Sequence, residues 1–233
     1  MATSGTSVFN LDFAEIAEEA FERAGLELRS GYDMRTARRS LNLLCAEWAN
    51  LGLNLWTIGT GTITLTPGKS VYTVADGVPA DMIDMIEHLT RTNNSGVNTD
   101  ISLNRISVSD YANIPTKSTQ GRPLQIYVNR QISPEITLWP VPDSSTTYTL
   151  VYWYLRRIQD TGASAANNAD IPVRFLPALV AGLAYQIALK RPEVSDRIQM
   201  LKGIYEEQFQ VAATEDRDRA PDRFIPFVSY GNY

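Results

Sequence analysis

Three arginines, Arg35, Arg38 and Arg39, form a compact charged cluster in the sequence. Steps of three and four residues place them on one flank of a helix. Guanidinium groups can contact phosphates or pair with carboxylates. The carboxylates of the preceding predicted helix are those of Glu15, Glu18, Glu19 and Glu22. The net charge of −5 favours pairing with these glutamates, in the same subunit or in a neighbour, over binding to nucleic acid, and both possibilities stay open.

No combination of residues indicates an enzyme. His88 is the only histidine, and it has no serine or cysteine motif nearby, so a structural or exposed histidine is expected. The spacing of Asp81, Asp84 and Glu87 fits no known cation-binding loop, which favours a solvated surface. Cys45 is the only cysteine and lies beside an apolar helix stripe, so a buried thiol is expected and no internal disulfide can form. We therefore predict no catalytic residue, no cofactor and no metal.

The composition is ordinary for a soluble globular protein, with 44% hydrophobic and 20% charged residues in a chain of 233. No window approaches the run of about 18 apolar residues that a membrane span requires. The first residues lack the basic and apolar regions of a signal peptide. These features predict synthesis in the cytoplasm and no membrane partner.

The arginine cluster lies in a long predicted helix that runs from about residue 34 to residue 51. Its apolar positions recur at steps of three and four and are Met34, Ala37, Leu41, Leu44, Trp48 and Leu51. We expect Asp33 to cap its first turn and Gly52 to end it. Leu41, Leu44 and Trp48 are predicted core residues. A shorter helix, from residue 10 or 12 to Gly25, should pack against it as an antiparallel hairpin.

The pattern changes to a period of two between residues 57 and 155, where Thr, Val, Ile and Tyr dominate. Strands are predicted at 62–65, 70–74, 82–88, 124–129, 136–139 and 147–154, with one short helix at 107–114. Residues 82–88 fit either a strand or a helix; the strand is favoured, with Met85 and Glu87 on one face and His88 on the other. Antiparallel meanders in a small sandwich or open barrel fit this spacing. The aromatic run Tyr152, Trp153 and Tyr154 should be half buried and half exposed.

Helical periodicity returns after a polar linker at 156–170. A helix starting at Asp170 or Pro172 is apolar nearly all round and should be central, and a fourth helix opens at Pro192. Its predicted apolar face is Val194, Ile198, Leu201, Tyr205, Phe209 and Ala212.

The predicted fold class is α+β: a four-helix bundle made of two N-terminal and two C-terminal helices, with an inserted antiparallel β-rich domain. The predicted divisions are 1–56, 57–155, 156–214 and 215–233.

The last division, 215–233, is charged first and then aromatic, without helical or strand periodicity. Its large apolar residues are Phe224, Ile225, Phe227, Val228, Tyr230 and Tyr233. An extended segment with this composition is expected to dock on a partner.

Several of these features together carry a resemblance to a known family. They are the helix pair, the exit WxxxGLxLW from Trp48 to Trp56, the hairpin at 62–74, the Asp-Ile-Pro before the central helix and the extended tail. In this combination the chain resembles the head-to-tail adaptors of tailed bacteriophages, the head-completion or tail-tubular-protein-A-like proteins. The β insertion, about a hundred residues, is larger than in the simplest helical members.

The resemblance implies a structural virion protein at the head–tail junction, made in the host cytoplasm. Such proteins form a ring, usually of twelve copies, below the portal. The expected partners are the portal protein, neighbouring copies, a downstream tail or nozzle protein, and packaged double-stranded DNA passing through the lumen. The C-terminal tail would reach the portal, and no enzymatic step is implied. Two alternatives stay open: another phage tail or baseplate component, and a nucleic-acid-binding module that uses the three arginines.

Overall fold

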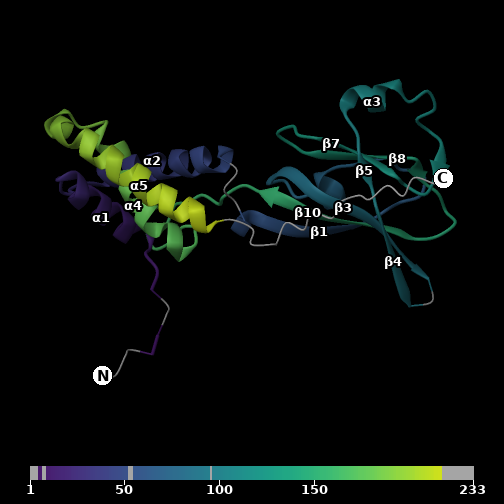
Figure 1. Cartoon of the computed structure of the whole chain (residues 1–233), viewed down its shortest axis with the longest axis horizontal. Helices are drawn as coiled ribbons and strands as arrows, with labels where there is room; N and C mark the ends of the chain where they lie inside the picture. The colour runs from purple at the N-terminus through teal and green to yellow at the C-terminus, as the bar shows by residue number, and fades with distance from the viewer. Residues whose placement is uncertain (1–4, 7–8, 52–54, 95, 217–233) are drawn as a thin grey trace, which may run out of the picture.

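The computed structural model describes residues 5–6, 9–51, 55–94 and 96–216, and within them the fold is mixed α+β. Figure 1 shows the long helices gathered at one end of the molecule and the strands at the other. The α-helices are α1 Phe13–Ala24, α2 Gly31–Asn50, α3 Val108–Asn113, α4 Leu176–Ala188 and α5 Ile198–Glu215. The 3-10 turns are η1 Leu55–Thr57, η2 Val74–Asp76, η3 Val173–Phe175 and η4 Pro192–Arg197.

Ten strands, counted over the described residues, lie at the other end of the molecule. They are β1 Ile58–Thr64, β2 Val71–Tyr72, β3 Met82–Asn94, β4 Val97–Ser102, β5 Asn104–Arg105, β6 Gln120–Gly121, β7 Gln125–Asn129, β8 Glu135–Trp139, β9 Val141–Pro142 and β10 Tyr148–Arg156. The strand orders are β1-β10-β3-β4, β2-β8-β7-β5 and β6-β9. Most pairs are antiparallel, as predicted, but β5–β7 and β6–β9 are parallel. The sheets are therefore not simple meanders, because β10 lies between β1 and β3.

Helix α1 has the predicted bounds because both of its ends are capped. The Glu15 N–H donates to Asp12 Oδ1 at 2.9 Å, and the Asp12 N–H donates to Glu15 Oε2 at 3.0 Å, which is a capping box. The helix ends at Gly25, whose φ of 78° is left-handed.

Helix α2 begins earlier than predicted, and Asp33 is not its N-cap. The N-cap is Ser30, whose hydroxyl oxygen accepts from the Asp33 N–H, and Asp33 is the third residue of that capping box. Asp33 also forms an ion pair with Arg191. The predicted helix end at Gly52 lies outside the described residues.

Helix α4 is central, as its apolar sequence predicts. Both α1 and α2 pack more extensively on α4 than on each other, so the predicted α1–α2 hairpin is only a minor contact. At Gly182 a Cβ atom would lie 2.8 Å from Leu44 Cδ2 and 2.9 Å from Tyr205 Cε2, too close for a methyl group. Glycine thus lets α2 and α5 approach α4 closely. One hydrophobic core joins α1, α2, α4 and α5, and it includes Leu41, Leu44 and Trp48.

Residues 82–94 form a strand, but the predicted alternation is wrong. Met82, Met85, His88 and Thr90 are buried, whereas Glu87 is exposed. The register with β10 shifts twice, between Trp153 and Tyr154 and between Leu155 and Arg156. Each irregularity inserts an extra residue into β3 and so changes which face the next side chain occupies.

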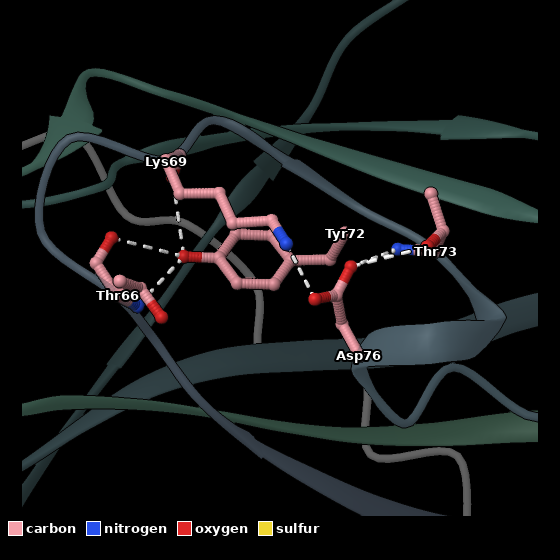
Figure 2. Close-up of polar contacts among 5 residues, drawn as sticks. All are labelled: Thr66, Lys69, Tyr72, Thr73 and Asp76. Carbon is pink, nitrogen blue, oxygen red and sulfur yellow. Dashed lines mark hydrogen bonds and ion pairs between the residues drawn. The ribbon is translucent and has the colours of Figure 1, made fainter.

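A polar network fixes the turn between β1 and η2 (Figure 2). The Thr66 N–H donates to the Tyr72 hydroxyl oxygen at 3.0 Å, and that hydroxyl donates to the Lys69 carbonyl at 3.1 Å. Asp76 accepts from the Thr73 N–H at 2.9 Å and pairs with Lys69. The Tyr72 ring is buried, so the turn is tied to the core of the β-rich end.

Residues 156–170 are predicted as a polar linker, and the structure shows an ordered connection. The Trp56 indole N–H donates to the Asp170 carbonyl at 3.0 Å, and Arg156 Nη2 donates to Asp170 Oδ1 at 3.0 Å. Farther along, the Phe13 N–H donates to the Asn167 carbonyl at 3.0 Å, and the Ala14 N–H donates to the Ala165 carbonyl at the same distance. The connection therefore packs against the start of α1.

Candidate assembly interface

The three predicted arginines do not act as one group. The Arg38 guanidinium lies over the buried Phe13 ring, 5.0 Å from its centroid, which joins α2 to the start of α1. Arg35 and Arg39 are exposed, and the charge of Arg39 helps lower the pKa of Lys190, after the larger effect of burial. Two of the three arginines therefore remain on the surface.

The four predicted glutamates, Glu15, Glu18, Glu19 and Glu22, lie together along one groove. It has a volume of about 470 Å³ and runs between α1 and the η3–α4 segment. Its other side is apolar and is lined by Val173, Leu176, Pro177 and Val180. The four glutamates could be found from the sequence, but the apolar side could not, because it comes from residues about 150 positions later.

Within the described residues no ion pair joins the three arginines to these glutamates. Glu15 caps its own helix, and Glu19 pairs with Arg23 at 2.8 Å. Glu18 and Glu22 are exposed on the rim of the groove. Pairing of the glutamates with a neighbouring subunit stays a prediction.

The outer face of α2 carries large apolar groups that the sequence analysis did not single out. Tyr32 is 61% exposed and Leu43 is 63% exposed. Their spacing places them on the same helix face as Arg35 and Arg39. A helix that is buried on one side thus presents a mixed aromatic, basic and aliphatic stripe on the other.

The end of α5 sets where the C-terminal segment begins. The buried Asp216 carboxylate pairs with Arg174 of η3, whose guanidinium lies 5.6 Å from the Phe175 ring centroid. The predicted docking residues Phe224, Ile225, Phe227, Val228, Tyr230 and Tyr233 lie outside the described residues. Asp216, the last residue that the structure describes, lies next to η3 through its ion pair with Arg174.

The β-rich end has an apolar hollow on the sheet that contains β3 and β10. It is lined in part by Ile58, Ile86 and Trp153, together with His88. Tyr152, the preceding residue of the aromatic run, is fully buried and covers Gly61, where a Cβ atom would lie 2.3 Å from the ring. Trp153 and Tyr154 are half-buried.

His88 is buried, and its Nδ1 has no hydrogen-bond partner among the described atoms. Burial lowers its pKa because the charged imidazolium is poorly solvated there. Of the three carboxylates near it in sequence, Asp84 pairs with Arg105 at 2.6 Å and with Arg130 at 3.3 Å. No group of three metal-ligating side chains occurs in the described part of the chain.

The single cysteine has no features of a reactive thiol. Cys45 is buried, and this burial, with the nearby charge of Asp170, raises its pKa to about 12. The thiol is therefore protonated at neutral pH.

Comparison with known proteins identifies the family. In the part of the chain that the structure describes, no helix is both long and apolar enough to cross a membrane. A comparison with curated proteins finds no match. The model of one family, the SU10 adaptor protein, matches residues 12–225, which is most of the chain and includes the helical end, the β-rich end and the groove. The protein therefore belongs to the SU10 adaptor protein family, a family of phage head-to-tail adaptors.

Proposed function

We propose that this protein is a ring-forming adaptor that joins the portal of a phage head to the tail. The observation that carries the proposal is the family match over residues 12–225. The arrangement of the chain, with its long helices at one end and its strands at the other (Figure 1), supports the proposal because the two ends would offer different surfaces to different neighbours. A ring of copies below the portal, expected to contain twelve, prolongs the DNA channel and helps to retain the packaged genome.

The proposal gives each part of the chain a role. The helices of residues 1–56 and 156–214 form a four-helix bundle that packs against neighbouring copies. The β-rich insertion, 57–155, faces the downstream tail or nozzle protein. The segment 215–233 docks on the portal through its aromatic residues. Within the adaptors, we place the protein with those that resemble the tail tubular protein A.

The net charge of −5 suits a wall along which DNA moves. Phosphates are repelled by an acidic surface, so passing double-stranded DNA would not be held. The location that follows is the head–tail junction of the virion. The proposed role involves no chemical reaction.

A pull-down with the portal protein tests the docking role of the C-terminal segment. Deleting Pro221–Tyr233 should abolish capture by the portal, while far-UV circular dichroism of the helices stays the same. Unchanged capture would remove the segment from the proposal. Negative-stain images of the full-length protein with and without portal should show a ring on the portal, and portal particles without added density would contradict the adaptor role.

The exposure of Arg35 and Arg39 favours one second candidate, a nucleic-acid-binding module. Phosphate contacts are released by salt, so they can be counted from the salt dependence of binding. Replacing Arg35 and Arg39 with alanine should weaken DNA binding and reduce its salt slope if this candidate holds. If the parent and the double variant bind DNA with equal affinity at each of two salt concentrations, a nucleic-acid-binding role for these arginines is excluded.

A further inference from the structure

Two unpartnered surfaces of the helical end have opposite charge. The first, here called the acidic groove, is lined by the α1 glutamates Glu15, Glu18, Glu19 and Glu22, by Arg23, which pairs with Glu19, and by the apolar residues Phe9, Leu11, Val173, Leu176, Pro177 and Val180. The second, here called the basic stripe, is the exposed face of α2 formed by Tyr32, Arg35, Arg39 and Leu43. Neither surface is covered by another described part of the chain.

The two surfaces match in chemistry. Glu18 and Glu22 form no ion pair among the described residues, and the same holds for Arg35 and Arg39. Val173, which is 53% exposed, offers an apolar contact to a large side chain such as Tyr32 or Leu43. The acidic and apolar groups of the groove are thus complementary to the basic and apolar groups of the stripe.

The two arginines of the stripe, about 6 Å apart along α2, are closer together than the ends of the row of glutamates. Glu15 and Glu22 are separated by about 10 Å along α1, at 1.5 Å per residue. Tyr32 and Leu43 are separated by about 16 Å along α2 by the same measure, with the arginines between them. A helix laid along the groove can therefore present both arginines to the glutamates.

A chain cannot bring its own basic stripe into its own groove. The opposite face of α2 is held in the core by Leu41, Leu44 and Trp48, and Arg38 is fixed over Phe13. In Figure 1, α1 lies in the lower part and α2 in the upper part of the helical end. The stripe of one copy can meet only the groove of another.

We propose that the acidic groove of each copy binds the basic stripe on α2 of the next copy. This inference rests on the proposed ring and names the contact that closes it. Two different patches meet, so the contact is heterologous, and repetition of a heterologous contact produces a closed ring when the rotation between copies allows it. The arrangement assigns Arg38 to the fold of the subunit and Arg35 and Arg39 to assembly.

Cross-linking between engineered cysteines tests the contact. The substitutions are Glu18→Cys in the groove and Arg39→Cys in the stripe, both at exposed positions. A short bis-maleimide is the reagent, and the native Cys45 is a suitable background because it is buried with its pKa raised to about 12. The full-length protein is treated both alone at high concentration and bound to portal.

The chain carrying both substitutions should give a ladder of covalent oligomers beyond the dimer. Each protein with only one of the two substitutions should give little product, and a mixture of these two proteins should stop at the dimer. A matched control replaces Arg39→Cys with Thr99→Cys, which is exposed on β4 far from the helices, and should give no ladder. If the doubly substituted protein gives no ladder either alone at high concentration or bound to portal, the proposal is overturned.

Charge reversal provides a second test. The variants Glu18→Arg with Glu22→Arg, and Arg35→Glu with Arg39→Glu, should each lose oligomers at low salt when alone. Mixing the two variants should restore oligomers in which the variants alternate, because the reversed groove of one meets the reversed stripe of the other, and the native groove of the second meets the native stripe of the first. Failure of the mixture to associate, while both variants keep the circular dichroism of the parent, contradicts the proposal.

Two other outcomes have separate meanings. If the residue-18 cysteine cross-links within one chain to a Phe224→Cys substitution, and no ladder forms, the C-terminal segment fills the groove and the proposal is wrong. A ladder without capture by portal would support this contact and refute the adaptor role. Capture by portal without a ladder would support the adaptor role and refute this contact.

Discussion

Replacing Tyr205 with phenylalanine should destabilise the helical end by removing one oxygen atom. The Trp48 indole N–H donates to the Tyr205 hydroxyl at 2.9 Å, and the Trp48 side chain is 1% exposed. This bond joins α2 to α5 across the close approach at Gly182. In the Tyr205→Phe variant the rings keep their packing, but the indole N–H has no acceptor and no access to solvent.

The expected cost follows from that geometry. A neutral hydrogen bond contributes about 0.5–1.5 kcal/mol, and a buried donor left without a partner costs about 1–3 kcal/mol. The second figure applies because the indole remains in place, so the free energy of unfolding should fall by about 1–3 kcal/mol. For a chain of this length that corresponds to a decrease in Tm of about 2–12 °C.

Urea denaturation followed by far-UV circular dichroism measures this loss. Tyr185→Phe is the matched control, since the Tyr185 ring stacks on Tyr205 at 6.4 Å and no hydrogen bond is assigned to its hydroxyl in the described structure. This control should change stability by less than about 0.5 kcal/mol.

A double-mutant cycle decides whether the hydrogen bond is the cause. With Trp48→Phe in place there is no indole donor, so adding Tyr205→Phe should cost little, and the coupling should be about 1–2 kcal/mol. If Tyr205→Phe costs the same with and without the indole, the reasoning is refuted.

Three further predictions concern single side chains. Tyr72→Phe should lower the free energy of unfolding by about 0.5–1.5 kcal/mol, because the Thr66 N–H loses its acceptor but, at an exposed residue, can bond to water instead (Figure 2); an unchanged urea midpoint would contradict it. The lowered pKa of His88 means that the unfolded chain binds a proton first, so stability should fall as the pH drops below about 6.5, by at most about 1.4 kcal/mol per pH unit. A His88→Gln variant, measured over the same pH range, should lack this slope, and equal slopes would refute the assignment. Cys45 should react with a thiol reagent at pH 8 only on unfolding, and fast labelling of the folded protein would show that its pKa is not raised to about 12.

The helices could be predicted from the sequence because their determinants are local. The periodicity of the apolar residues gave α1, α2, α4 and α5. Ser107 before the short helix α3 is a cap that lies next to the element it starts. The start of α2 was misplaced because Ser30 and Asp33 both suit a cap, and the choice depends on the ion pair of Asp33 with Arg191, 158 residues away.

The strands show the opposite case. The faces of β3 could not be predicted, because its irregularities arise from pairing with β10, about sixty residues later. The order of the loop at 156–170 likewise depends on Asp170 meeting Trp56 and Arg156. Of the candidate interface, the charged residues were found from local spacing. The apolar side of the groove and the separate role of Arg38 depend on tertiary contacts.

The connection at Asp170 bears on how an adaptor could transmit position from head to tail. Burial alone would raise the pKa of Asp170, but the hydrogen bonds from Arg156 and the Gln159 N–H leave it lowered, so the carboxylate stays charged at neutral pH. The same residue binds Trp56, and Trp56 and Phe175 pack with ring centroids 5.0 Å apart. Within the described residues, the two chain segments that connect the helical and the β-rich end are thus both tied to Asp170. Turning one end against the other must break these contacts together, so in the proposed ring the contacts between helices would also fix the direction in which every β-rich end faces the tail.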